Sequence, residues 1–330
     1  MTNEDYKKLN DYLNKSCINL TKNDSFLLNN IRLLTILNDK CYFHIKDYNT
    51  DATICHNKLT YEEIINITRK IINMINPNWV VIYDRLIDTG ELDFSYNSEY
   101  HGSHMRYTED RKEININREF SYEDVVVLVH EFTHYIANNK TFNENYYLLT
   151  EFFAIISEFI AKTYLLGFEC IPINEIDINF RLRDLKHNSY CFYKYELSLL
   201  AFQCFGDLNE NTYELLNQYF LKIDKETFLN ECKAVLALYE KNEKDINEML
   251  SNDYRYVLGT LLALYCYKNR KVKDVIQLCD NFNNEKYQNM NVYEILNSIG
   301  IDIYSKEFYD DITDSIDNYF NLDKQTNKTK

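Results

Sequence analysis

Residues 125–136 read VVVLVHEFTHYI, and two histidines and a glutamate interrupt this otherwise apolar run. His130 and His134 are four residues apart, so on a helix they lie one turn apart on the same face and can bind one metal ion. Glu131 follows one step around the helix, where it can reach a water that the metal polarises. Burying such groups without partners costs roughly 2–7 kcal/mol each. A metal ion satisfies them more simply than two unrelated hydrogen-bond networks would.

A zinc site of this kind needs a third protein ligand and an open fourth position. Residues 146–166 read YYLLTEFFAIISEFIAKTYLL, an apolar helix whose only acidic residues are Glu151 and Glu158. These two are seven residues apart and so share one face of the helix. We predict that Glu151 joins His130 and His134 in holding a single Zn²⁺ ion. Glu158 either accepts the free N–H of a ligating histidine or is a solvated residue on an exposed stripe.

The composition favours a mostly helical protein in a reducing compartment. Its 330 residues suffice for a sizeable core, and only two prolines and six glycines interrupt the chain. Nine scattered cysteines form no CxxC pair, so we expect free thiols, and the polar N-terminus lacks the apolar core of a signal peptide. Both features predict a cytoplasmic protein. The net charge of −15 argues against nucleic acid or an anionic membrane surface as a partner.

The first half of the chain predicts helices followed by one short strand. A capping box at Thr60–Glu63 opens a helix, Pro77 ends it, and Trp79–Leu86 begins another apolar segment. Residues 88–112 are polar and predict a loop or hairpin. The alternation of apolar and polar residues at Glu113–Asn117 predicts a strand. Such a strand either pairs with an extended peptide through its main chain or is an ordinary structural edge.

The metal-binding helix is expected to be capped by Ser121–Asp124, and Asn138–Asn139 can end it. We see no internal repeat and no linker rich in glycine or proline. This favours a single catalytic unit that spans residues 1–330. Its expected parts are N-terminal helices in 1–59, a core region in 60–268, and C-terminal helices with a disordered tail in 269–330. The further helices that we predict are one or two within 1–40, then 190–206, 210–222, 226–241, 254–268, 271–280, 290–299 and 306–320.

With these residues in view, the chain resembles the thimet oligopeptidase and oligoendopeptidase F family of gluzincin peptidases, and the oligoendopeptidase F branch more closely. The likeness is collinear from about Thr60 to Ala263, which corresponds to the family's catalytic half. The stretches that carry it are Tyr61–Trp79, Asp84–Gly102, Asn117–Val125 followed by LVHEFTH, Glu151-x-x-Ala154-x-x-x-Glu158, and Tyr254-x-Tyr256-x-x-Gly259-x-x-x-Ala263.

The resemblance implies a mainly α, zincin-type (gluzincin) catalytic domain with a small β-sheet next to the zinc helix. It also implies that Tyr256, and in addition Tyr254, donates a hydrogen bond to the developing oxyanion. The segment around Gly102 and the predicted strand, with Ile114 and Asn115, would hold the peptide in extended form.

Three departures from the family's pattern concern the surroundings of the metal. Thr133 stands where the family usually has glycine, and Ala137 stands where it has a further histidine. Residues 244–253 lack the histidine expected before the tyrosine pair. His104 and His187 are the candidates to replace it, although neither is at a matching position.

The sequence therefore predicts a zinc-dependent metalloendopeptidase that hydrolyses short, unfolded peptides with Glu131 as general base. The missing histidines motivate an alternative, a degenerate relative that keeps zinc and binds peptides or a partner without turnover. A purely structural zinc ion that links two helices is disfavoured, because structural sites normally have four protein ligands and are usually rich in cysteine.

Overall fold

The structure is a computed structural model, and two compact units emerge from the contacts within the chain. One unit comprises Met1–Asn49, Asn179–Val257 and Asp302–Lys330, and the other comprises Thr50–Ile178 and Leu258–Ile301. We call the latter the metal unit, because all the predicted metal ligands lie in it. The prediction of a single catalytic unit stays a prediction. The structure describes residues 33, 58–94, 102–107, 112–117, 119–137, 147–166, 213–214, 217, 224–230, 233 and 243–315, without the side chains of 107, 166, 243–254 and 288.

The first described helix begins at the predicted capping box. In α3 (Tyr61–Ile75) the Thr60 side chain accepts from the Glu63 amide at 3.2 Å, and the Glu63 carboxylate accepts from the Thr60 amide at 2.7 Å. Both groups satisfy amides that have no partner inside the helix. Helix α4 (Trp79–Asp88) follows after Pro77, close to the predicted segment.

A three-stranded sheet follows, formed by β1 (Leu92–Asp93), β2 (His104–Tyr107) and β3 (Lys112–Asn115) in the order β1-β3-β2. β3 pairs in parallel with β1 and antiparallel with β2. The antiparallel pair confirms a hairpin within the predicted loop or hairpin region. The predicted strand at 113–117 is found as β3, displaced toward the N-terminus.

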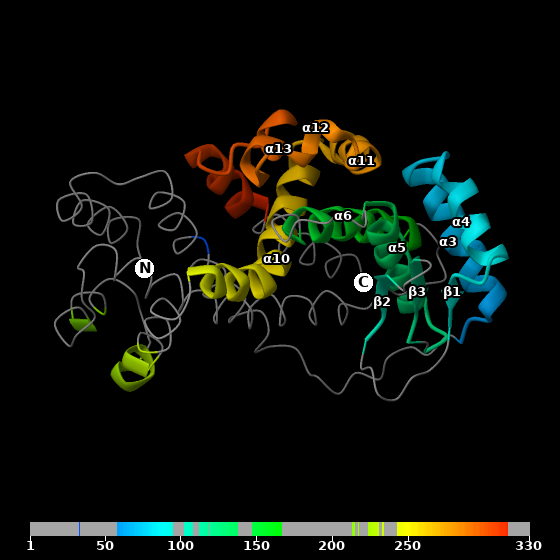
Figure 1. Ribbon diagram of the computed structural model, residues 1–330, viewed down its shortest axis with the longest axis horizontal. Coiled ribbons are helices and arrows are strands. Elements are labelled where there is room, and N and C mark those ends of the chain that lie inside the picture. Colours follow the sequence, from blue (N-terminus) through cyan, green and yellow to red (C-terminus); the bar gives the residue numbers. More distant parts are fainter. Residues whose placement is uncertain are drawn as a thin grey trace, which may run out of the picture. The chain divides into compact units, whose positions relative to one another are not determined.

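The two predicted metal-binding helices are α5 (Tyr122–Ala137) and α6 (Tyr147–Leu166), which lie side by side with the strands next to α5 (Figure 1). Phe132 of α5 is fully buried, and its side chain points away from the histidine face of the helix. Its ring makes edge contacts with Trp79 and Tyr83, at centroid distances of 6.4 and 5.4 Å. This aromatic cluster fixes the rotation of α5, because a helix packed by Phe132 must direct its histidines to another face.

The start of α5 is held by the buried carboxylate of Asp124. It accepts from the amides of Glu119 at 3.1 Å and Phe120 at 2.8 Å, while Ser121 Oγ accepts from the Glu123 amide at 3.2 Å. Phe120 adopts a φ of 57°, a left-handed conformation that is unfavourable for a bulky residue and is held here by Asp124. The predicted capping segment is therefore confirmed as the helix start, and Asn138–Asn139 lie outside the described residues.

The remaining described helices largely follow the predicted pattern, with one error in extent. α10 runs over Glu243–Lys268, so the expected beginning near residue 254 was wrong. No glycine or proline interrupts residues 243–258, so nothing in the backbone stops the helix there. The short α12 was not predicted, because a single turn shows no periodicity. The later elements are α11 (Val272–Asn281), α12 (Glu285–Gln288), α13 (Val292–Ser298) and a helical stretch at 306–315.

Other predictions fall wholly or partly outside the described residues. The helix expected at 190–206 and the tail after 323 lie outside them, as does the predicted 1–40 segment apart from Leu33. The described parts of the 210–222 and 226–241 segments are helical. Cys266 and Cys279 are buried free thiols, as expected. None of the helices in the described part of the chain combines the length and the apolar character needed to cross a membrane.

Candidate metal centre

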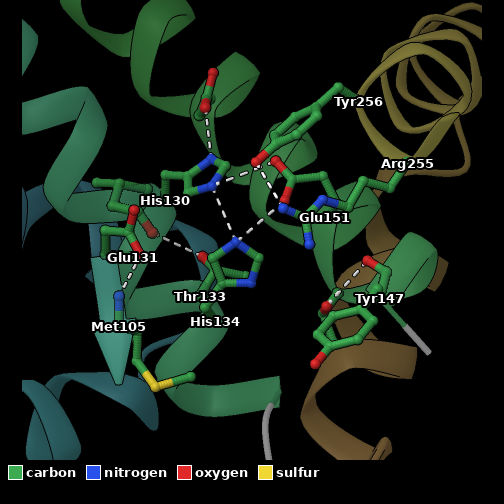
Figure 2. Close-up of polar contacts among 12 residues, drawn as sticks. Met105, His130, Glu131, Thr133, His134, Tyr147, Glu151, Arg255 and Tyr256 are labelled. Carbon is green, nitrogen blue, oxygen red and sulfur yellow. Dashed lines mark hydrogen bonds and ion pairs between the residues drawn. The ribbon is translucent and has the colours of Figure 1, made fainter. Parts of the chain in front are cut away.

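His130 and His134 direct their imidazoles from one face of α5 toward a common point (Figure 2). Their Nε2 atoms lie 3.0 Å apart, and the ring centroids are 4.6 Å apart with planes at 75°. The four-residue spacing produces this approach, because residues i and i+4 lie one turn apart on the helix surface. Two lone pairs converging in this way are suited to sharing a cation.

Glu151, from α6, brings its carboxylate close to both imidazoles. Its Oε1 lies 3.5 Å from His130 Nε2, and its Oε2 lies 3.5 Å from His134 Nε2. The Glu151 side chain is almost entirely buried, so these groups meet in a largely dry environment. In the part of the chain that the structure describes, these three residues form a group that could hold a metal ion.

The spacing of these three groups is compatible with a metal ion of the size of zinc. In a tetrahedral zinc site with bonds of about 2.0–2.1 Å, neighbouring ligand atoms lie about 3.3 Å apart. The two Nε2 atoms are 3.0 Å apart, and each lies 3.5 Å from a different oxygen of the Glu151 carboxylate, so these separations are close to that value. The donor set of two imidazoles and one carboxylate is also one that catalytic zinc sites use.

Glu158 contacts the other nitrogen of His130. Its Oε1 lies 2.6 Å from His130 Nδ1. The carboxylates of Glu158 and Glu151 come from the same face of α6. Lys162, one turn further along α6, places its Nζ 3.9 Å from the second oxygen of Glu158. With Nδ1–H donating to Glu158, the Nε2 lone pair of neutral His130 faces the metal position. The buried position of Glu158 contradicts the alternative of a solvated stripe.

The surrounding carboxylates control the protonation of His130. Burial lowers the pKa of its imidazole, but the hydrogen bond that it donates to Glu158 and the negative charges of Glu158, Glu151 and Glu131 outweigh burial and raise the pKa to about 9. Without a cation the centre therefore favours a protonated His130, because three carboxylates lie near it. A metal ion would have to displace that proton.

Glu131, the predicted general base, lies beside these three residues and is also largely buried. Its Oε2 accepts a hydrogen bond of 2.8 Å from the main-chain N–H of Met105 in β2 (Figure 2). It is not one of the three grouped donors, which is consistent with a role in proton transfer. The Met105 amide was missed by sequence reasoning, because a main-chain group leaves no mark in the side-chain pattern.

The Thr133 side chain, at the position between the two histidines where glycine was expected, is accommodated inside the protein. Its side chain is fully buried, and its Oγ1 donates to the carbonyl of Val129 at 2.8 Å. The hydroxyl is thus satisfied within the helix itself. The position faces the protein interior and leaves the histidine face unchanged.

The predicted peptide-binding edge needs a correction. β3 is the central strand, with β1 on one side and β2 on the other, so its main chain is already paired. The expectation that Ile114 and Asn115 provide an edge was therefore wrong, and the fully buried Ile114 side chain faces the core. Sequence reasoning failed because β1 is only two residues long and shows no alternation. Gly102 is exposed, and its contact with a substrate stays a prediction.

The predicted tyrosines lie on α10, in the part that belongs to the other compact unit. Tyr256 is exposed, and its hydroxyl accepts from Arg255 Nη2 at 2.9 Å. The Tyr254 side chain lies outside the described ones, so the roles of both tyrosines stay predictions. His104 is the first residue of β2, with its Nδ1 3.4 Å from the carbonyl oxygen of Gly102, while His187 lies outside the described residues.

Comparison with known proteins supports the fold. No family model matches the sequence, and no curated protein does. A crystal structure named for oligoendopeptidase F, from Bacillus anthracis str. Ames, matches with a TM-score of 0.52 and 14% identity, covering 90% of this chain and 56% of that one. A structure of PZ peptidase A with an inhibitor matches with a TM-score of 0.47 and 13% identity, covering 98% of this chain and 59% of that one.

The chain thus spans less than two thirds of the length of either protein. The similarity to the first structure confirms the expected fold, mainly helical with a small three-stranded sheet. It also supports, at the level of the fold, the resemblance inferred from sequence.

Proposed function

We propose that this protein is a zinc-dependent peptidase that hydrolyses peptide bonds in short, unfolded peptides. The observation that carries the proposal is the group formed by His130, His134 and Glu151, whose donor atoms lie close together, with the buried carboxylate of Glu131 beside it. Two findings support it further. The separations between these donor groups are close to those in a tetrahedral zinc site, and a structure of the same fold is named for a peptidase.

His130, His134 and Glu151 would hold one zinc ion and leave a coordination position open. Zinc, when bound, polarises a water molecule and a peptide carbonyl and lowers the pKa of the water to about 7. Zinc is favoured over magnesium or calcium because the latter prefer oxygen ligands, whereas two of the three donors here are imidazoles.

Residues of the chain would carry out the proton transfer, orient a metal ligand and stabilise the oxyanion. Glu131 takes the proton from the attacking water and returns it to the leaving amine, so that the peptide nitrogen departs as a neutral group. Glu158 holds the Nδ1–H of His130 and thereby keeps its Nε2 directed at the ion. By the resemblance, the hydroxyl of Tyr256 stabilises the oxyanion that forms on the scissile carbonyl.

Glu131→Gln tests this assignment, because the amide keeps the shape of the side chain and cannot take up the proton. We expect the zinc-loaded wild type to cleave members of a pool of quenched peptides, and Glu131→Gln to lower kcat/KM by about 100-fold or more with the same zinc content. Glu123→Gln is the matched control, since Glu123 is an exposed glutamate on the same helix. Metal analysis of each protein accompanies the assay.

The alternative is a zinc-binding relative that binds peptides or a partner without turnover, motivated by Ala137 and the histidine missing before the tyrosine pair. A zinc-loaded wild type that cleaves nothing in the pool would favour this alternative. Equal activity of Glu131→Gln and wild type would remove Glu131 from the reaction.

A further inference from the structure

The hydrogen-bonding pattern of the sheet determines which way the main chain of Met105 points. The amides of Ile114 and Ile116 donate to carbonyls of the β1 segment, those of Glu91 and Asp93, at 2.8 Å each. Since successive peptide groups of a strand alternate in direction, the main-chain groups of residues 113 and 115 face β2. Their partners are residues 106 and 104, so the main-chain groups of Met105 face away from the sheet.

This outward-facing N–H of Met105 donates to Glu131 Oε2 at 2.8 Å. An N–H of an edge strand would otherwise be open to solvent or to another strand. Here it is paired with a carboxylate that is itself largely buried. Hydrogen bonds to an ionised acceptor are about twice as strong as those between neutral groups, so this contact is well suited to fixing a side chain.

We propose that the main-chain N–H of Met105 is the positioning group for Glu131. This inference rests on the proposed function, in which Glu131 moves the proton. A glutamate turns readily about its terminal bond, and both of its oxygens are equivalent until one of them is held. With Oε2 bound to Met105, the carboxylate has one orientation, and Oε1 is the oxygen left for the proton.

The side chain of residue 105 has no part in this role. Any residue with a main-chain N–H at this position should therefore hold Glu131, and only proline, which has no N–H, should not. Proline is tolerated on an edge strand where the N–H that it removes faces away from the sheet. Met105→Ala and Met105→Pro therefore form a matched pair. Both lose the methionine side chain, and only the second loses the N–H.

The activity experiment compares this pair as zinc-loaded proteins on a quenched peptide that the wild type cleaves. We expect the kcat of Met105→Pro to lie about 10- to 100-fold below that of Met105→Ala, because a misplaced catalytic group costs up to about 100-fold. KM and zinc content should be the same in both. Equal kcat values in two folded, zinc-loaded proteins would overturn the proposal.

A second experiment needs no turnover and stays informative if the protein cleaves nothing. The chain has five methionines, so ¹⁵N-methionine labelling gives a simple spectrum in which Met105→Ala identifies the Met105 signal. We expect Glu131→Ala to speed the hydrogen exchange of the Met105 amide by about tenfold or more, because the amide loses its acceptor. The amide of Met290, which donates to the carbonyl of Tyr287 at 3.2 Å, is the internal control.

The two experiments separate the possible failures. If exchange at Met105 is the same in wild type and Glu131→Ala, the hydrogen bond does not hold Glu131 and the proposal is overturned. If exchange quickens but the wild type has no peptidase activity, the contact stands and the proposed function fails. Since Glu131→Ala leaves the strand sequence unchanged, the exchange experiment is decisive even if Met105→Pro does not fold.

Discussion

The Nδ1 atom of His130 and the Oε1 atom of Glu158 lie 2.6 Å apart, joining the helix that provides two donor atoms to the helix that provides the third. The same face of α6 thus both brings Glu151 to the two imidazoles and orients one of the histidines. A rotation of either helix would break both sets of contacts together. The geometry of the centre is therefore a property of the α5 and α6 packing and not of any single side chain.

Loss of the negative charge at Glu158 should weaken metal binding. We expect Glu158→Gln to raise the Kd for zinc by about 10- to 100-fold, since partners of this kind hold the ligating histidine in its tautomer and increase its basicity. Competition with a chromophoric chelator measures the Kd. Glu123→Gln, on the exposed side of α5, should bind zinc as the wild type does. An unchanged Kd for Glu158→Gln would show that Glu158 does not support the ligand.

Metal binding should release a proton from His130. Its pKa is raised to about 9, so below that pH the imidazole of the metal-free protein is protonated, and the ion must displace this proton. The apparent zinc affinity should therefore rise about tenfold per pH unit between pH 6 and 8 and level off above 9. Calorimetry in two buffers of different ionisation enthalpy counts the protons. A pH-independent affinity without proton release would contradict this assignment.

The grouping of the three candidate metal ligands could be predicted because each is a polar residue in an apolar helix. Buried polar groups such as His130, His134 and Glu151 need polar partners, and helical spacing alone places the histidines together. The sequence could not show that β3 is central, because β1 is too short to have a pattern. Nor could it show the contact of Met105 with Glu131, which depends on the direction of a peptide group.

Tyr256→Phe tests the part of the mechanism that rests on the resemblance. If the hydroxyl stabilises the oxyanion, its removal should lower kcat by a factor on the order of 100, while zinc content stays unchanged. Tyr254→Phe, two residues earlier on α10, is the comparison that shows which of the two tyrosines acts. Steady-state kinetics on one quenched peptide suffices. Wild-type rates for both variants would remove the tyrosines from the site.

Gly259 of α10 packs within the metal unit against α6, at Phe152 and Ile155. A Cβ at this position would lie 3.0 Å from Ile155 Cδ1 and 3.4 Å from the amide nitrogen of Phe152. Alanine gains about 1 kcal/mol of helix propensity and requires only a small shift of the flexible Ile155 terminus, so Gly259→Ala should change the stability by no more than about 1 kcal/mol.

Leucine at position 259 cannot be accommodated in this way, because the backbone of Phe152 blocks it. We expect Gly259→Leu to destabilise the protein by about 1–3 kcal/mol and, by displacing α6, to weaken zinc binding. Thermal denaturation and chelator competition measure the two effects, and a Gly259→Leu protein as stable as the wild type would mean that α10 and α6 do not pack here.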